Sequence, residues 1–374
     1  MKKSRLDKTY IVVFCCMLAL CIFGCVMVYS ASSFSAQKNF NTSTHFLIKQ
    51  IIGVAMGLLA CVFFSYYDYH KLKKFKWVLF IISIVLLVLV FVPKIGISNY
   101  GAKRWINLFG LSFQPSEIAK FSLVLFSACH FSENRDKAKS FKTMLPVIFV
   151  GGTFCVLVIL EPNMSITMCL GITMLCMLFF GGVKPKYFAL ILVPALCLVP
   201  ILIIIEPYRL QRLIAFLDPW ASPQGEGFQT IQSLYSLGNG GLFGVGLFSS
   251  RQKYLYLPFA ESDFIFSIIC EELGFFGAGV ILIIFIVLIF SLIKIAQNAK
   301  DMFASLLAGG VACVISTQVI LNILVVTNSI PPTGLPLPFI SAGSTSLVVF
   351  MSAIGVCLNI AKQSKVRAFG YLDN

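Results

Sequence analysis

The stretch YIVVFCCMLALCIFGCVMVYS, residues 10–30, decides the fold because it contains no charged side chain. A helix of about 20 apolar residues can cross a hydrocarbon layer about 30 Å thick. Similar runs recur along the chain, which predicts a polytopic helical membrane protein. The first run is long and lacks a small-residue cleavage site, so we expect a retained helix rather than a cleaved signal.

The composition points the same way. Of the 374 residues, 58% are hydrophobic and only 12% are charged, whereas soluble proteins carry about 25% charged residues. These values argue against a cytosolic enzyme. The formal net charge of +14 could suggest nucleic-acid binding, but the basic residues cluster in short loops between the apolar runs. That distribution is typical of membrane topology, and we expect no nucleic-acid partner.

We expect one all-α domain over residues 1–374, with about ten transmembrane helices and a long extracytoplasmic loop, about 206–262, between spans seven and eight. Ten spans place both termini on one side. The face with the termini carries 19 Lys and Arg residues and the other face carries eight, so the positive-inside rule places both termini in the cytoplasm. The predicted spans are 10–30, 46–66, 77–93, 115–131, 143–160, 164–180, 187–205, 263–293, 302–326 and 341–361.

The cysteine and histidine patterns indicate no metal centre. All 13 Cys lie within apolar runs or at their ends, without metal-ligand spacing, and free Cys behaves there as a small hydrophobe. His45, His70 and His130 lie in separate loops or at helix ends. We therefore expect neither disulfides nor a zinc site.

Basic residues on the outer face are the first candidates for ligand binding. They could extend towards lipid headgroups, but three pairs in the long outer loops fit an anionic ligand better. Arg and Lys stabilise charge on phosphoryl oxygens, so a diphosphate is the natural candidate. The pairs are Lys103 with Arg104, Arg209 with Arg212, and Arg251 with Lys253.

Glu117 and Lys120 in QPSEIAK form a second candidate group, at the outer end of the fourth span. Their i, i+3 spacing places them on one helix face, close enough to pair. Ionisable residues within a span usually face a polar cavity and are functional. A structural ion pair between packed helices would give the same pattern.

Asp263 ends the long loop in YLPFAESDFIF. It could cap the apolar helix that follows, or it could act as a general base at the rim of a membrane-embedded cavity. Glu261 is its nearest acidic neighbour, and Glu271 and Glu272 lie further into the same span as packing or cavity-lining charges. The residues themselves leave both interpretations of Asp263 open.

The glycine-rich run GNGGLFGVGLFSSRQK, residues 238–253, is not a nucleotide-binding motif. It follows no predicted strand and has no P-loop Lys-Ser/Thr pair. We expect a tight re-entrant turn whose backbone N–H groups face a ligand.

Four stretches together resemble the SEDS family of FtsW, RodA and SpoVE, polytopic glycosyltransferases that polymerise lipid II into peptidoglycan. They occur in the family order, and the similarity covers nearly the whole chain. The stretches are GAKRWINLFGLSFQPSEIAK (101–120), DPWASPQGEGFQTIQSLYSLGNGGLFGVGLFSSRQKYLYLP (218–258), ESDFIFSIICEELGFFG (261–277) and PPTGLPLPFISAG (331–343).

The resemblance implies that Asp263 is the catalytic carboxylate. It would deprotonate the GlcNAc 4-hydroxyl of lipid II, which then attacks the lipid-linked chain and expels undecaprenyl diphosphate with inversion at the anomeric carbon. Ten further residues of the matched motifs are expected to bind substrate. They are Glu117, Lys120, Lys103, Arg104, Trp105, Gln114, Arg251, Lys253, Glu261 and Ser341.

Two motifs depart from the family pattern. Asn163 in EPNMS stands where the family usually has Asp, and SAGSTS puts Ala342 and Ser344 where it has Tyr and Gly. If that Asp helps to hold a divalent cation, Mg or Mn, this chain must hold the cation otherwise or do without it. We therefore assign no cofactor from the sequence.

The resemblance also implies a partner, a class B penicillin-binding protein that crosslinks the new glycan, together with other division or elongation proteins. It further implies a location in the bacterial cell membrane, at the septum for a division enzyme. General similarity favours the FtsW and SpoVE branch, for division or sporulation, over the RodA elongation branch. A lipid II flippase and a scaffold without chemistry are the competing functions. A flippase should show a polar path through the bilayer, whereas the ionisable residues here concentrate towards the outer side, which favours the enzyme.

Overall fold

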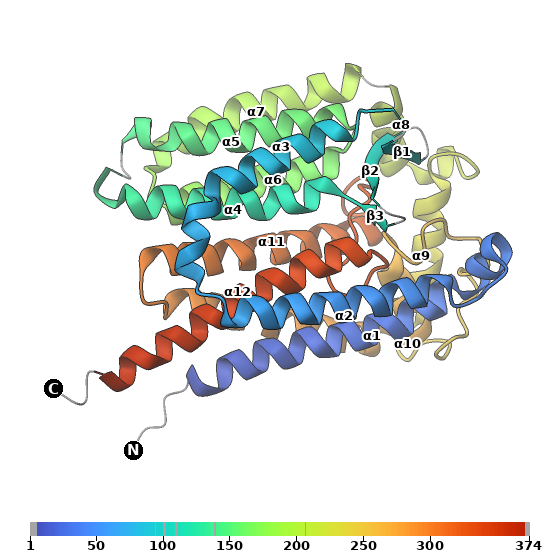
Figure 1. The fold of residues 1–374 in the computed structure, drawn as a ribbon. Helices are drawn as coiled ribbons and strands as arrows, with labels where there is room; N and C mark the ends of the chain where they lie inside the picture. Colours follow the sequence, from blue (N-terminus) through green and yellow to red (C-terminus); the bar gives the residue numbers. More distant parts are fainter. Residues whose placement is uncertain are drawn as a thin grey trace.

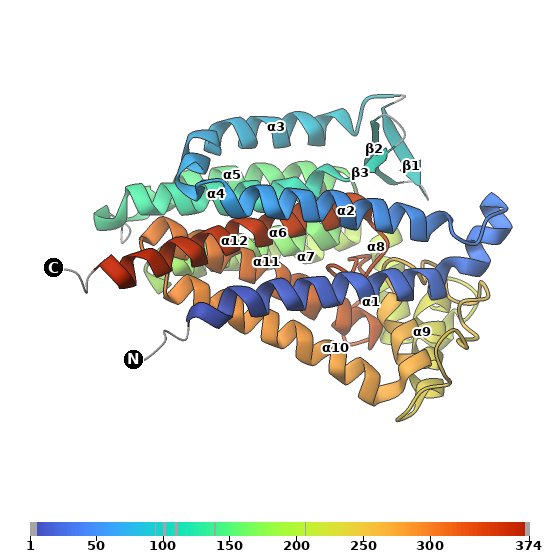
Figure 2. The ribbon, with the colours of Figure 1, turned by 60° about the horizontal axis from the view of Figure 1, so that its bottom comes forward.

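The long helices lie side by side in a bundle, with both termini at the same end (Figures 1 and 2). The computed structural model describes residues 6–370, apart from residues 94, 100–101, 109–110, 138–139 and 206. Each of the ten predicted spans falls on a helix. These helices are α1 (Leu6–Phe40), α2 (His45–Tyr66), α3 (Lys76–Leu89), α4 (Pro115–Glu133), α5 (Phe141–Leu160), α6 (Met164–Phe180), α7 (Pro185–Ile205), α10 (Ile265–Gln297), α11 (Met302–Val326) and α12 (Ser344–Gly370).

Length and composition make this a multi-pass membrane fold. Within the described part of the chain, six helices are long and apolar enough to cross a membrane, namely α1, α2, α5, α10, α11 and α12. Helix α11 lies at the centre, since 72% of its most apolar stretch is buried, against 22% in α2. It packs against α4, α6, α10 and α12. The other helices expose apolar side chains, as expected of helices that face lipid.

A small antiparallel sheet accompanies the helices of this nearly all-helical fold. Its strands are β1 (Gly96–Asn99), β2 (Ala102–Leu108) and β3 (Leu111–Phe113), in the order β1-β2-β3. Ile106 pairs with Gly96 on one side and with Phe113 on the other, and its side chain is buried. The sheet lies at the end of the bundle opposite the termini (Figures 1 and 2). Strands this short carry too little alternation to be recognised in the sequence.

The predicted loop 206–262 contains two helices. Helix α8 (Pro207–Leu217) follows α7, and α9 (Phe228–Gly240) packs against α10. In the sequence, apolar residues recur with helical spacing within Gln229–Leu237, and α9 covers this stretch. Three short 3₁₀ helices complete the described elements: η1 (Tyr69–Phe75), η2 (Arg135–Lys137) and η3 (Pro219–Ala221).

Helix α10 is broken at Gly274, whose φ of 67° and ψ of −170° are not helical. Glycine adopts this conformation without a Cβ clash. The glycine-rich turn after α9 pairs with the backbone groups around the break, so its N–H groups do not face a ligand as predicted. The bonds are Val245 N–H to Glu271 O (2.9 Å), Gly246 N–H to Glu272 O (3.0 Å), Phe275 N–H to Gly241 O (2.9 Å) and Phe276 N–H to Leu242 O (3.1 Å).

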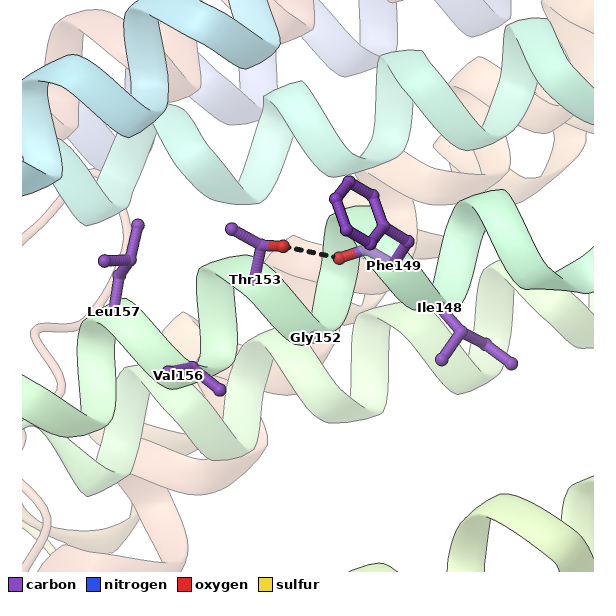
Figure 3. Close-up of a pocket in the computed structure, with 6 residues that line it drawn as sticks. All are labelled: Ile148, Phe149, Gly152, Thr153, Val156 and Leu157. Atoms are coloured by element: carbon purple, nitrogen blue, oxygen red, sulfur yellow. Dashed lines mark hydrogen bonds between the residues drawn. The ribbon is translucent and has the colours of Figure 1, made fainter.

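A shallow hollow on α5 is lined mostly by apolar side chains (Figure 3). Thr153 Oγ1 donates to Phe149 O at 2.8 Å, so its hydroxyl is satisfied within the helix. No atom lies within 4 Å of the position that a Cβ on Gly152 would take. This surface suits contact with lipid chains. The lining residues are Ile148, Phe149, Gly152, Thr153, Val156 and Leu157.

Helices α2 and α12 meet at small residues. A Cβ on Gly355 would lie 2.4 Å from Cys61 O, a backbone atom that cannot move aside. Gly57 makes a similar close approach to Met351. The two helices therefore need glycine at this contact, as is common where helices pack in lipid.

Gly355→Ala should destabilise the protein by about 1–3 kcal/mol, because the added methyl overpacks the α2–α12 contact. Thermal unfolding in detergent measures the effect. Gly152→Ala is the matched control, since its methyl enters open space and alanine favours the helix by up to about 1 kcal/mol. Equal unfolding temperatures for the two variants would contradict this account of the contact.

Candidate active site

The proline-rich segment 331–343 organises the end of the bundle opposite the termini. Proline has no N–H group, so the carbonyls of such a segment need donors from elsewhere. Side chains of α2, α6, α8 and α11 supply them. The bonds are Gln50 Nε2 to Ile340 O (3.4 Å) and Ser341 O (3.3 Å), Ser165 Oγ to Thr333 O, Arg212 Nη1 to Pro332 O (3.0 Å), Gln318 Nε2 to Pro336 O (2.8 Å) and Asn322 Nδ2 to Leu335 O (2.7 Å).

The backbone around Asp263 is held by the same segment. Ser341 Oγ donates to Ser262 O at 2.6 Å, and the Ala342 N–H donates to Glu261 O at 2.8 Å. Asn322 Nδ2 donates to Asp263 O at 2.8 Å. Ser341 thus supports the backbone beside Asp263, and its predicted contact with substrate stays a prediction.

The Asp263 carboxylate itself accepts no hydrogen bond from the described residues. Helix α10 begins at Ile265 with Phe264 at the N-cap, so the capping interpretation of Asp263 is wrong. Gly334 makes room for the carboxylate, because a Cβ there would lie 3.1 Å from Asp263 Oδ2. The side chain is half-buried, and its carboxylate accepts no hydrogen bond from the described residues. It is therefore able to accept a proton.

Charged groups from two other segments, and Glu261 of its own segment, act on Asp263. Burial raises the pKa of its carboxyl to about 6, although Arg104 and Arg212 lower it and Glu261 raises it slightly. Burial also raises the pKa of Glu261. Arg104 lies on β2 and its Nη2 donates to Pro162 O in the α5–α6 turn. The fold therefore brings Arg104 and Arg212, from distant parts of the sequence, close to Asp263 and its neighbour Glu261.

Glu117 and Lys120 form the expected pair, fully buried, with 3.0 Å between Lys120 Nζ and the Glu117 carboxylate. Lys120 Nζ also donates to Gln318 Oε1 and lies 5.2 Å from the centre of the Phe350 ring. Through Lys120, the pair therefore connects α4 to α11 and α12. Gln318 and Asn322 were not singled out in the sequence, although two amides in an apolar span are a signal for buried polar contacts.

Three predicted residues lie in or beside the small sheet. Trp105 on β2 is half-buried, and Gln114 is buried at the N-cap position of α4 without a capping bond. The backbone of Lys103 pairs with Ser98, but its side chain lies outside the described residues. Contact of these residues with substrate stays a prediction.

Lys253 is buried in an ion pair with α10, and its ammonium is not directed to an open surface. Its Nζ lies 3.0 Å from Glu272 Oε1 and 3.2 Å from Ser30 Oγ. The Arg251 backbone N–H donates to Glu271 Oε1 at 3.1 Å, while the Arg251 side chain is exposed. Glu271 and Glu272 thus anchor the turn after α9 to α10 and α1.

The turn between α5 and α6 contains the position where the family motif usually has Asp. Asn163 caps α6, since its side chain accepts from the Ile166 N–H at 3.3 Å. Among the described residues, no group of three or more His, Cys, Asp and Glu side chains could hold a metal ion. These residues do not form a cation cage, and we assign no metal ion to the site.

Residues 10–366 match the family model FtsW/RodA/SpoVE, described as cell cycle protein. The chain belongs to this family. Stage V sporulation protein E of Bacillus subtilis (strain 168) is 37% identical to it over 97% of this chain and 99% of the relative. A probable peptidoglycan glycosyltransferase FtsW of Geobacter sp. (strain M18) is 38% identical over 96% of this chain and 99% of the relative.

Solved structures of this family share the fold. A chain from a peptidoglycan synthase complex, studied for its coordination of polymerization and crosslinking, is 27% identical with a TM-score of 0.77, over 94% of this chain and 97% of that chain. The rod shape determining protein RodA of Thermus thermophilus is 24% identical with a TM-score of 0.69, over 94% and 96%. The second likeness shows the fold alone. The predicted family and the polytopic helical fold are confirmed.

Lys253→Met should destabilise the protein by about 3–5 kcal/mol, because it leaves the buried Glu272 carboxylate without its cation. Denaturation in detergent measures the loss. Adding Glu272→Gln should restore much of it, since the buried charge is then gone. Arg251→Met is the exposed control, expected within about 0.5 kcal/mol of the wild type. A single Lys253 variant as stable as the Arg251 variant would contradict the buried pair.

Proposed function

We propose that this family member is a peptidoglycan glycosyltransferase that polymerises lipid II into β-1,4 glycan strands at the outer leaflet, with Asp263 as the general base. The observation that carries the assignment is the state of Asp263. Hydrogen bonds to the carbonyls of Ser262 and Asp263 fix its backbone. Its carboxylate accepts no hydrogen bond from the described residues and feels the positive charges of Arg104 and Arg212. The named glycosyltransferase relatives support the reaction class.

The reaction needs one base and a stabilised leaving group. Asp263 takes the proton of the GlcNAc 4-hydroxyl as its oxygen bonds to the anomeric carbon of the growing chain. The bond from that carbon to the diphosphate oxygen breaks, and undecaprenyl diphosphate leaves with the electron pair. Attack from the opposite face converts the α-linked diphosphate into a β-linkage without a covalent enzyme intermediate.

The arginines supply what the leaving group needs. Negative charge grows on the diphosphate as the bond breaks, and guanidinium groups stabilise phosphoryl oxygens well. Arg104 and Arg212 already act on the base from β2 and α8. Because both are positioned by carbonyls of neighbouring turns, little reorganisation is needed when the charge develops.

The orientation follows from the charge count and the shape of the bundle. The loop between α9 and α10 carries Asp263. It lies at the end of the bundle opposite both termini (Figures 1 and 2). The positive-inside rule assigns the termini to the cytoplasm, so the proposed reaction takes place at the extracytoplasmic surface. A septal location would fit a division or sporulation enzyme.

A transpeptidase is the proposed partner. The solved relative with a TM-score of 0.77 belongs to a complex that coordinates polymerization and crosslinking. We propose a class B penicillin-binding protein in the same position for this chain, with other division or elongation proteins of the membrane. The newly made glycan would then be crosslinked where it emerges.

Asp263→Asn should abolish glycan polymerisation, because the amide cannot accept the hydroxyl proton. The purified protein with its penicillin-binding protein is given labelled lipid II, and the products are separated on a gel. Glu226→Gln, an exposed carboxylate of the same outer segment, is the control and should give the wild-type ladder.

Other outcomes would assign a different function. A ladder from folded Asp263→Asn would remove Asp263 from the chemistry. The absence of any ladder from the wild type, together with lipid II transfer across vesicles, would favour the flippase.

Polymerisation should fall by about tenfold for each pH unit below about 6, because a base must be ionised to accept a proton and the pKa of Asp263 is raised to about 6. Initial rates at saturating lipid II between about pH 4.5 and 7.5 measure this limb. A rate that stays constant down to about pH 4.5 would contradict Asp263 as the base.

A further inference from the structure

Asn322 on α11 joins two segments that meet at the proposed base. Its side chain is buried, and its Nδ2 donates to Asp263 O at 2.8 Å and to Leu335 O at 2.7 Å. An amide nitrogen carries two hydrogens, so both are used. Because both neighbours are carbonyl oxygens, the amide must turn its nitrogen, and not its oxygen, towards them.

The two carbonyls belong to the segment that carries the base and to the segment beside its carboxylate. Leu335 directly follows Gly334, and a Cβ on Gly334 would lie 3.1 Å from Asp263 Oδ2. The Asn322 amide thus holds the backbone that carries the carboxylate and the backbone next to the carboxylate. One planar group therefore sets the separation of the two.

Helix α11 is suited to hold such a position. Of its most apolar stretch, 72% is buried, and it packs against α4, α6, α10 and α12. Gln318, one turn before Asn322 on the same helix, donates to Pro336 O at 2.8 Å. The central helix therefore holds two successive carbonyls of the proline-rich segment. Support from a packed helix positions a group more exactly than support from a loop.

We propose that Asn322 is a positioning residue for polymerisation. Its amide keeps the backbone of Asp263 and that of Gly334 and Leu335 at a fixed separation, which holds the carboxylate in one place for proton transfer. In this role Asn322 acts through Asp263 and not on the substrate. The inference rests on the proposed function and adds a residue outside the four matched motifs.

Asn322→Leu tests the proposal, because it removes both donors and keeps a side chain of similar size. The full chain with its penicillin-binding protein is given labelled lipid II over a range of concentrations. A displacement of about 1 Å can cost about 100-fold in rate, so kcat should fall by about that factor. KM should change little, since the lost bonds position the base and do not bind lipid II.

Asn359→Leu is the matched control. Asn359 is also a buried amide, whose Nδ2 donates to Ser65 O at 3.0 Å and whose Oδ1 accepts from the Tyr69 N–H at 3.2 Å. It connects α12 to α2 and η1 and has no bond to the proposed site. Its loss should lower the unfolding temperature in detergent as the Asn322 variant does, while the folded protein keeps the kcat and KM of the wild type.

Several results would overturn the proposal. A folded Asn322→Leu protein with the kcat of the wild type would show that the amide does not position the base. A raised KM with unchanged kcat would place Asn322 in substrate binding instead. An equal loss of kcat in Asn359→Leu would show that the removal of any buried amide has this effect.

A second variant covers the case in which Asn322→Leu does not fold. Asn322→Asp has the same shape, and its protonated form can donate to only one of the two carbonyls. We expect it to lower kcat by at least about tenfold, and an unchanged kcat would contradict the proposal. If neither variant folds while Asn359→Leu does, the amide serves the fold as a whole and the proposal is wrong.

A structure of Asn322→Leu or Asn322→Asp, whichever folds, tests the positioning without an activity assay. Compared with the wild type, the Asp263 backbone should be displaced relative to Gly334 and Leu335, and an unmoved backbone would overturn the inference. Absence of a ladder from the wild type would instead count against the proposed function. The two failures are therefore distinguishable.

Discussion

Hydrogen bonds from side chains to the carbonyls of the proline-rich segment 331–343 are the constraint on which the site depends. The prolines remove N–H donors from this segment, so it cannot satisfy its carbonyls by pairing with itself. Gln318 and Asn322 of α11 and Arg212 of α8 reach it instead. Ser341 and Asn322 also donate to the carbonyl oxygens of Ser262 and Asp263. The segment and the central helix α11 therefore fix the backbone of the proposed base together.

The carboxylates near the start of α10 illustrate how environment separates structural from chemical groups. Glu271 and Glu272 are fully buried and receive backbone N–H groups, hydroxyls and the Lys253 ammonium. Such compensation is what makes a buried charge tolerable. Asp263 lies two residues before Ile265, the first residue of the helix, and its carboxylate receives no such donors from the described residues. It remains available for proton transfer because the backbone, rather than the carboxylate, fixes its place.

The same electrostatic reasoning applies to the basic residues of the outer face. Arg104 and Arg212 are anchored on carbonyls, which orient a guanidinium without neutralising it. Lys253 is anchored on a carboxylate, which does neutralise it. Lys253 is therefore part of the packing, whereas Arg104 and Arg212 act on Asp263.

The sequence by itself determined the membrane fold, the ten long helices and the family, because apolar runs and ordered motifs are local properties of the chain. It also found Asp263 and the Glu117–Lys120 pair, since ionisable residues near apolar spans stand out. It left a helix cap and a base at Asp263 both open, and its expectation of a glycine-rich turn that faces a ligand was wrong. Those questions depend on contacts between residues far apart in sequence, such as Asp263 with Asn322 and Lys253 with Ser30. Only the tertiary structure brought Arg104 and Arg212 close to Asp263, because proximity between distant segments is a property of the packed molecule.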